Sequence, residues 1–160
     1  MKVSRLPIDL KYLFENKYIE CIQMLIILFL LKQRRKGIDF EELLYYFTLL
    51  SVTTIDSQNS FYIDDTYIQN NYLTYEKTIR DNMIILSNQN FVKINVEPTE
   101  KKNIMYSKIT EEGKSLVSSM DNSYFKREIE KFKNIIETRK FNSKNQREVL
   151  VKNENKIKVT

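Results

Sequence analysis

Few residues in this sequence could take part in chemistry, because the 160-residue chain has no histidine and a single cysteine, Cys21. Histidine is the commonest general base at neutral pH, and it belongs to the Ser-His-Asp triad and to most zinc sites, so these sites are excluded. One cysteine excludes an internal disulfide and an all-cysteine zinc site. The two glycines, Gly37 and Gly113, are too few for a glycine-rich phosphate-binding loop.

Carboxylates are the remaining candidates for metal-dependent chemistry. Five lie in polar stretches where they could surround a magnesium ion: Asp56, Asp64, Asp65, Glu97 and Glu100. Nuclease-type Glu-x-Lys strings also occur, such as Glu15-Asn16-Lys17. Charges in polar loops are usually solvated, and structural ion pairs imitate sites. The sequence therefore favours a protein that is not an enzyme and that holds no metal or cofactor.

Four tyrosines close together in the sequence point to another kind of site, in which aromatic rings stack on bases: Tyr62, Tyr67, Tyr72 and Tyr75. Stacking would contribute about 1–3 kcal/mol for each base. No basic residue lies between Gln58 and Glu76, however, and tyrosine also fills half-buried positions and interfaces. We therefore interpret these tyrosines as structural.

The apolar pattern predicts the helices that would position any site in the first half. Asn16 would cap a long helix over 17–36 that is apolar on most sides, and Gly37 would end it. The segment before it would be an arm or a first helix. Asp39 would cap a second helix, over 40–52, with acidic residues in its first turn.

The second half follows a helix, hairpin, helix pattern after a polar gap over 53–72 that would hold at most a small strand or a helical turn. Thr74 would cap the next helix, in which Ile84 and Ile85 broaden the apolar face. The pattern then predicts a helix over 75–89, a strand over 91–96, a turn over 97–103, a strand over 104–109 and a helix opening at Thr110. An amphipathic helix follows Asn122 or Ser123, and its apolar seam is Phe125, Ile129, Phe132 and Ile136.

Charge is distributed unevenly along the chain. Residues 1–120 carry 15 Lys/Arg and 15 Asp/Glu, whereas 121–160 carry 11 and 6, so the whole excess of +5 lies in the C-terminal part. We interpret 1–120 as one domain, 121–140 as a C-terminal amphipathic helix and 141–160 as a basic, loosely ordered tail. No signal peptide is evident, and the eight-residue apolar run 24–31 is shorter than the roughly 20 residues of a membrane span. A cytoplasmic protein without membrane contact is expected.

The segment LSNQNFVKI…YSKITEEGKSLV is similar to the wing of the MarR and PadR regulators. Helix, hairpin and helix are the back half of a winged helix-turn-helix, so we expect a mainly α fold with a small β-hairpin, α+β by strict count. The resemblance implies a DNA-binding homodimer whose helix over 75–89 lies in the major groove. The possible DNA contacts are then Lys77, Arg80 and Asn82 on that helix, with Lys101 and Lys102 at the wing.

Two features argue against direct DNA binding. Residues 38–81 contain eight acidic and two basic residues, a net charge of −6 on the part that would approach phosphates. The predicted link between the two helices, 53–72, is also far longer than the three or four residues of a helix-turn-helix. The sequence therefore favours an accessory subunit that binds a larger protein, with Phe125, Ile129, Phe132 and Ile136 as a possible partner interface.

The order of an apolar helix, an acidic middle, a wing and a trailing helix resembles the small subunits of SMC-type ATPase complexes. With the segment KYIECIQMLIILFLLKQRRKGIDFEELLYYFTLL, it resembles the middle component of bacterial ABC three-component or Lamassu-type anti-phage defence systems. The resemblance implies an SMC-like ATPase partner, a nuclease-type effector and a DNA-sensing complex. A third alternative is that the tail binds nucleic acid non-specifically through Lys140, Lys144, Arg147, Lys152, Lys156 and Lys158.

Overall fold

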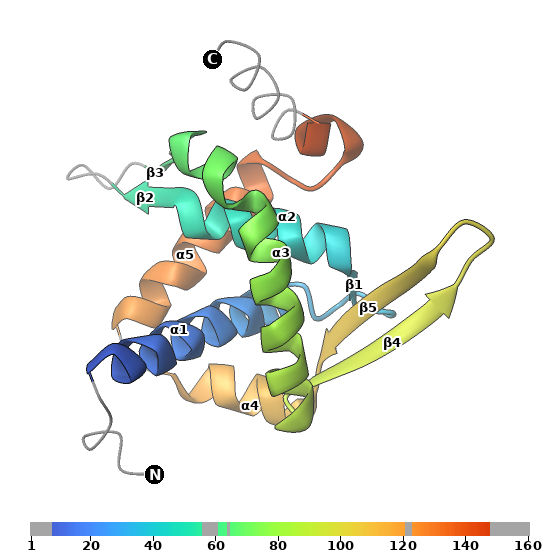
Figure 1. The fold of residues 1–160 in the computed structure, drawn as a ribbon, viewed down its shortest axis with the longest axis horizontal. Helices are drawn as coiled ribbons and strands as arrows, with labels where there is room; N and C mark the ends of the chain where they lie inside the picture. Colours follow the sequence, from blue (N-terminus) through green and yellow to red (C-terminus); the bar gives the residue numbers. More distant parts are fainter. Residues whose placement is uncertain (1–7, 56–60, 64, 121–122, 148–160) are drawn as a thin grey trace.

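The computed structural model describes residues 8–55, 61–63, 65–120 and 123–147. Within them the fold is mainly helical with a small antiparallel sheet, so the predicted fold class is confirmed at that level (Figure 1). The elements in chain order are α1 (Ile8–Leu30), β1 (Ile38–Asp39), α2 (Phe40–Val52), β2 (Thr53–Ile55), β3 (Phe61–Ile63), α3 (Asp65–Asn88), β4 (Val92–Pro98), β5 (Asn103–Ile109), α4 (Glu111–Ser119) and α5 (Ser123–Thr138).

The first helix starts earlier and ends earlier than the sequence predicted. α1 runs through Asn16, so this residue is not an N-cap, and residues 8–15 of the segment before it belong to the same helix. α1 ends at Leu30, and residues 31–37 form a loop of turns. Gly37 closes this loop with a φ of 88°, and a Cβ at this position would overlap the carbonyl oxygen of Ser107. The loop therefore approaches β5 as closely as only glycine allows.

α2 begins and ends as the sequence predicted. The Asp39 side chain accepts a hydrogen bond of 2.8 Å from the backbone N–H of Glu42, which satisfies one of the free donors of the first turn. The Glu42 carboxylate in turn accepts two hydrogen bonds from the Arg34 guanidinium, at 2.9 and 3.1 Å. This bidentate pair fastens the loop after α1 to the start of α2.

The polar gap after α2 is shorter and more ordered than predicted. β2 and β3 pair as an antiparallel hairpin, which agrees with the small strand that the sequence allowed. α3 begins at Asp65 rather than near residue 75, so Thr74 lies inside the helix and does not cap it. The link between α2 and α3 is therefore 53–64. A hairpin occupies much of this link, so it is still not the tight turn of a helix-turn-helix.

The predicted β4–β5 hairpin is confirmed, and a third strand joins it. β4 and β5 pair over their full length, with Val92 opposite Ile109 at the base. A backbone hydrogen bond of 2.9 Å from Thr99 to Lys102 closes the turn at the tip. The short β1 pairs with the other edge of β5, which gives the strand order β1-β5-β4. Figure 1 shows the hairpin projecting from the helical body.

The hydrophobic core lies where α1, α2, α3 and α5 meet. Residues 21–28 of α1 and 42–50 of α2 are buried in unbroken runs, because both helices are covered on most sides. Burial raises the pKa of the Cys21 thiol to about 11, so this side chain stays neutral near pH 7. None of the helices in the described part of the chain is long and apolar enough to cross a bilayer.

The chain after α5 returns across α2. The Phe132 ring of α5 meets the Tyr46 ring edge-on, with centroids 5.2 Å apart. Beyond the helix, the backbone N–H of Phe141 donates to the Tyr46 hydroxyl at 2.9 Å, and residues 143–147 are helical. The first residues of the predicted tail are therefore fastened to α2, whereas 148–160 lie outside the described residues.

Candidate interaction site

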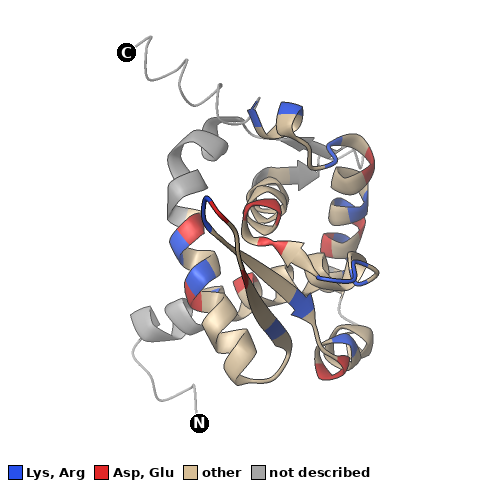
Figure 2. Ribbon diagram, turned by 90° about the vertical axis from the view of Figure 1, so that its right-hand side faces the viewer, with Lys and Arg blue, Asp and Glu red and all other residues tan. Residues whose placement is uncertain are grey.

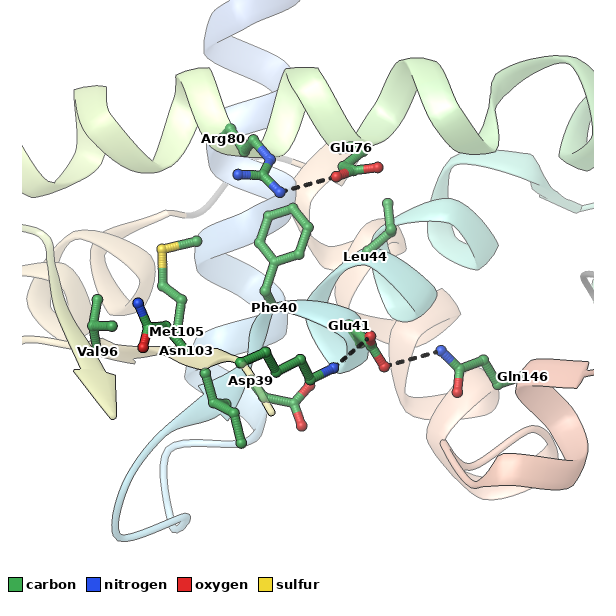
Figure 3. Close-up of a pocket in the computed structure, with 12 residues that line it drawn as sticks. Asp39, Phe40, Glu41, Leu44, Glu76, Arg80, Val96, Asn103, Met105 and Gln146 are labelled. Carbon is green, nitrogen blue, oxygen red and sulfur yellow. Dashed lines mark hydrogen bonds and ion pairs between the residues drawn. The ribbon is translucent and has the colours of Figure 1, made fainter. Parts of the chain in front are cut away.

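A cleft of about 610 Å³ opens between the start of α2, one side of α3 and the outer half of the β4–β5 hairpin (Figure 3). The segment after α5 reaches one end of it with Gln146. Two of the five predicted DNA contacts, Arg80 and Lys102, line this cleft. The cleft therefore brings together two of the cations that the sequence predicted to contact DNA.

Arg80 is held in the cleft by a carboxylate and an aromatic ring. Its guanidinium donates to the Glu76 carboxylate at 2.9 Å, one helical turn earlier on α3. The guanidinium carbon also lies 4.8 Å from the centre of the Phe40 ring, a cation–π distance. Figure 3 shows Arg80 reaching across to both partners. A phosphate would have to compete with Glu76 for this arginine.

On the hairpin side of the cleft, Lys102 is also paired with a carboxylate. Its ammonium group donates to the Glu41 carboxylate of α2 at 3.2 Å, which links the tip of the hairpin to the helix. The side-chain amide of Gln146 lies 3.5 Å from the other oxygen of the same carboxylate. Both predicted cations in the cleft therefore have anionic neighbours, and the cleft does not form a continuous basic ridge.

The other three predicted DNA contacts lie in different settings. Lys77 on α3 and Lys101 at the hairpin tip are exposed. Asn82 is fully buried, so the prediction that it faces a base is wrong. Its amide donates to the Glu20 carboxylate of α1 at 2.9 Å, and its carbonyl oxygen has no hydrogen-bond partner among the described residues. Asn82 joins α3 to α1 instead of reading DNA.

Exposed apolar side chains on α3 and β4 are a feature that the sequence analysis missed. Ile84 is 59% exposed, Ile85 40% and Val96 56%. Ile84 lies one helical turn after Arg80, on the same face of α3, and Val96 lines the cleft. The sequence predicted that the two isoleucines broaden the inner face of α3. They do not, because Ile79, Met83 and Leu86 already fill that face. The signal was present: neither isoleucine falls on the 79, 83, 86 stripe.

The apolar seam of α5 is already used by the chain itself. Phe132 is fully buried, and Phe125, Ile129 and Ile136 pack against the same core. The next residue in this seam is Ile135, which is also buried. This side of α5 therefore leaves little apolar surface free for the partner interface that the sequence predicted there.

Only two of the five carboxylates considered for magnesium have described side chains. Asp56, Asp64 and the side chain of Asp65 lie outside the described part of the structure. Glu97 forms an ion pair with Lys36 at 3.0 Å, and Glu100 is exposed at the hairpin turn. Among the described residues, no group of three histidine, cysteine or acidic side chains is placed to hold a metal ion.

No protein-family model, curated protein or solved structure matches the chain.

Proposed function

We propose that this protein is a winged-helix accessory subunit, not an enzyme, that binds a larger protein partner. The order of elements supports the winged-helix interpretation, because a short strand between the first two long helices pairs beside a hairpin that follows the third helix. β4 and β5 are then the wing, and α3 takes the place of the recognition helix. The β2–β3 hairpin between α2 and α3 is the main departure from a helix-turn-helix.

One observation carries the proposal: α3 presents to solvent Ile84, which is one turn after Arg80, and the neighbouring Ile85. A recognition helix needs cationic and hydrogen-bonding side chains on this face. Exposed isoleucines beside a cleft instead provide apolar area that a protein partner can bury. Val96 on the wing extends this apolar area to the other side of the cleft.

The charges near these isoleucines support the same proposal. Arg80 and Lys102 each have a carboxylate within 3.2 Å, so the cleft presents mixed charge. DNA affinity depends on cations that replace condensed counterions on phosphates, and neutralised cations contribute little of this effect. Mixed charges around an apolar centre are, in contrast, the ordinary composition of a protein interface.

The partner we propose is an SMC-like ABC ATPase of a bacterial anti-phage defence system, with a nuclease-type effector as the third component. The resemblance in sequence layout to the middle component of such systems supports this choice. In that complex the protein would act in the cytoplasm and would contact DNA through the assembly. The apolar part of α3 would be the surface that the ATPase or the effector covers.

Co-expression of the tagged chain with the ATPase and effector encoded beside it tests the proposal. The wild-type chain is expected to retain the ATPase in a fixed ratio through affinity and size-exclusion steps. Replacing both Ile84 and Ile85 by lysine should abolish this retention without unfolding the chain, because both side chains are exposed. The matched control is Tyr18→Lys with Ile19→Lys, a neighbouring pair on α1 that is 59% and 36% exposed. Equal loss in both double variants, or a wild-type chain that never retains the ATPase, would contradict the proposal.

A MarR- or PadR-type regulator is the second candidate function. It is favoured by Lys77 and Lys101, which stay exposed on α3 and at the wing tip. This candidate requires a homodimer whose binding to duplex DNA is lost when these two lysines are replaced by glutamate. The experiment in the next section includes this pair of substitutions.

A further inference from the structure

The outer face of the β4–β5 hairpin, opposite the buried Val92, Ser107 and Ile109, carries an unusual set of charges, and one of its residues, Ile104, also lines the cleft. Side chains alternate along each strand, and Val92, Ser107 and Ile109 are buried on the inner face. The residues between them therefore point outward: Lys93, Asn95 and Glu97 on β4, and Ile104, Tyr106 and Lys108 on β5. We call these six residues the outer wing face.

Lys93 and Lys108 stand directly opposite each other on this face. Like charges in such cross-strand pairs destabilise a hairpin, whereas opposite charges stabilise it. Neither lysine forms a described ion pair with an acidic side chain, and Lys108 instead donates to the backbone carbonyl oxygen of Arg35 at 3.1 Å. The fold thus keeps two facing cations that no described carboxylate neutralises.

The loop after α1 brings two more cations to the same face. The close approach of this loop to β5 at Gly37 places Arg35 and Lys36 beside the hairpin. The Lys36 ammonium group lies 5.9 Å from the centre of the Tyr106 ring and forms an ion pair with Glu97 at 3.0 Å. Figure 2 shows blue segments on both strands of the hairpin and on the neighbouring loop. On this side Lys36 is therefore paired with Glu97, whereas Lys93 and Lys108 have no described carboxylate partner.

We propose that the outer wing face, together with Arg35 and Lys36, binds the phosphate backbone of a nucleic acid. Lysine and arginine bind phosphate oxygens directly, and the neighbouring asparagine amide and tyrosine hydroxyl are common donors to phosphate and sugar. The face has one aliphatic side chain, Ile104, so it lacks the apolar centre that a protein partner would bury. This site differs from the face of α3 that reads DNA in a helix-turn-helix protein.

Fluorescence anisotropy of the full chain with a labelled 20-base-pair duplex, and with one of its single strands, tests this site. The variant is Lys93→Glu with Lys108→Glu, and the control is Lys77→Glu with Lys101→Glu, which changes the net charge equally on α3 and the wing tip. We expect a loss of affinity of about tenfold or more for the first pair, and a salt-dependence slope smaller by about two. The control pair should bind within about twofold of wild type, because its lysines lie elsewhere.

Several results would overturn this site. Equal losses for the two pairs would show a general charge effect, and a larger loss for Lys77→Glu with Lys101→Glu would place DNA on α3. Wild type that binds neither probe at low salt, or that binds polyglutamate as tightly as DNA, would also exclude it. Thermal melts identify a misfolded variant, in which case Lys93→Gln with Lys108→Gln replaces it and should still weaken binding at least threefold. The ratio of duplex to single-strand affinity then tells which form of the backbone fits the face.

Discussion

The two sides of the β4–β5 hairpin differ in the partners of their lysine and arginine side chains. On the cleft side, Arg80 and Lys102 each lie within 3.2 Å of a carboxylate, and the exposed Val96 lines the same cleft. On the outer wing face, Lys93 and Lys108 face each other, and Glu97 is the single carboxylate. The first arrangement fits a protein partner, and the second fits a polyanion.

This contrast shows that charge summed along a sequence window does not predict the field at a surface. The window 38–81 carries a net charge of −6, on which the expectation that DNA does not bind the cleft depends. The cations of the outer wing face, Lys93 and Lys108, and those of the neighbouring loop, at 35–36, all lie outside that window. A hairpin can therefore present an acidic neighbourhood on one side and a basic one on the other.

Replacing Gly37 by alanine should have the largest effect on this contrast. The residue has a positive φ, and the added methyl would overlap the Ser107 carbonyl oxygen, so the loop after α1 must move away from β5. We expect the free energy of unfolding to fall by about 2–3 kcal/mol, measured by urea denaturation. Nucleic-acid affinity should fall as well, because Arg35 and Lys36 would leave the outer wing face.

Ser115→Ala is the control for that substitution, since this side chain is exposed on α4 and should change stability little. If Gly37→Ala unfolds at the wild-type urea concentration, the loop does not approach β5 as described. Arg35 and Lys36 would then not belong to the same surface as Lys93 and Lys108.

Local signals in the sequence predicted part of this fold. The Asp39 cap, the β4–β5 hairpin and the apolar seam of α5 each depend on neighbours within a few residues, so spacing was sufficient. The start of α3 was missed, because Thr74 is a good cap by type but lies within a helix that begins at Asp65. Side-chain propensity alone does not decide between two possible starts.

The candidate sites also contain some contacts that local spacing predicts and others that it does not. The Glu76–Arg80 pair was readable from its i, i+4 spacing, and the register of the hairpin would have placed Lys93 opposite Lys108. The contact between Glu41 and Lys102 joins residues far apart in sequence, so no local pattern contains it. The stripe of Ile79, Met83 and Leu86 predicts which side of α3 is buried, but the position of the hairpin beside α3 depends on how the sheet packs, and the pattern of a single helix does not record this.

Replacing Lys93 alone by glutamate separates stability from binding on the outer wing face. The new carboxylate would face Lys108 across the strands, so we expect thermal unfolding to report a gain of about 0.5 kcal/mol. Affinity for duplex DNA should fall at the same time, because a cation has become an anion. Lys101→Glu at the hairpin tip has the same change in charge and should show neither effect. A loss of stability in Lys93→Glu would mean that the two lysines do not face each other.

The smallest expected effect lies in the cleft, at the pair formed by Glu76 and Arg80. Both side chains are partly exposed, so a double-mutant cycle with Glu76→Gln and Arg80→Gln should give a coupling energy of about 0.3–0.5 kcal/mol that salt reduces. The cycle is needed because Arg80→Gln also loses the contact with the Phe40 ring. We expect the cleft to disfavour a polyanion through the negative charge of Glu41 and Glu76 together, so Glu76→Gln alone should raise duplex affinity only slightly. A gain as large as the loss caused by Lys93→Glu would make the two sides of the hairpin equivalent and would remove the contrast between them.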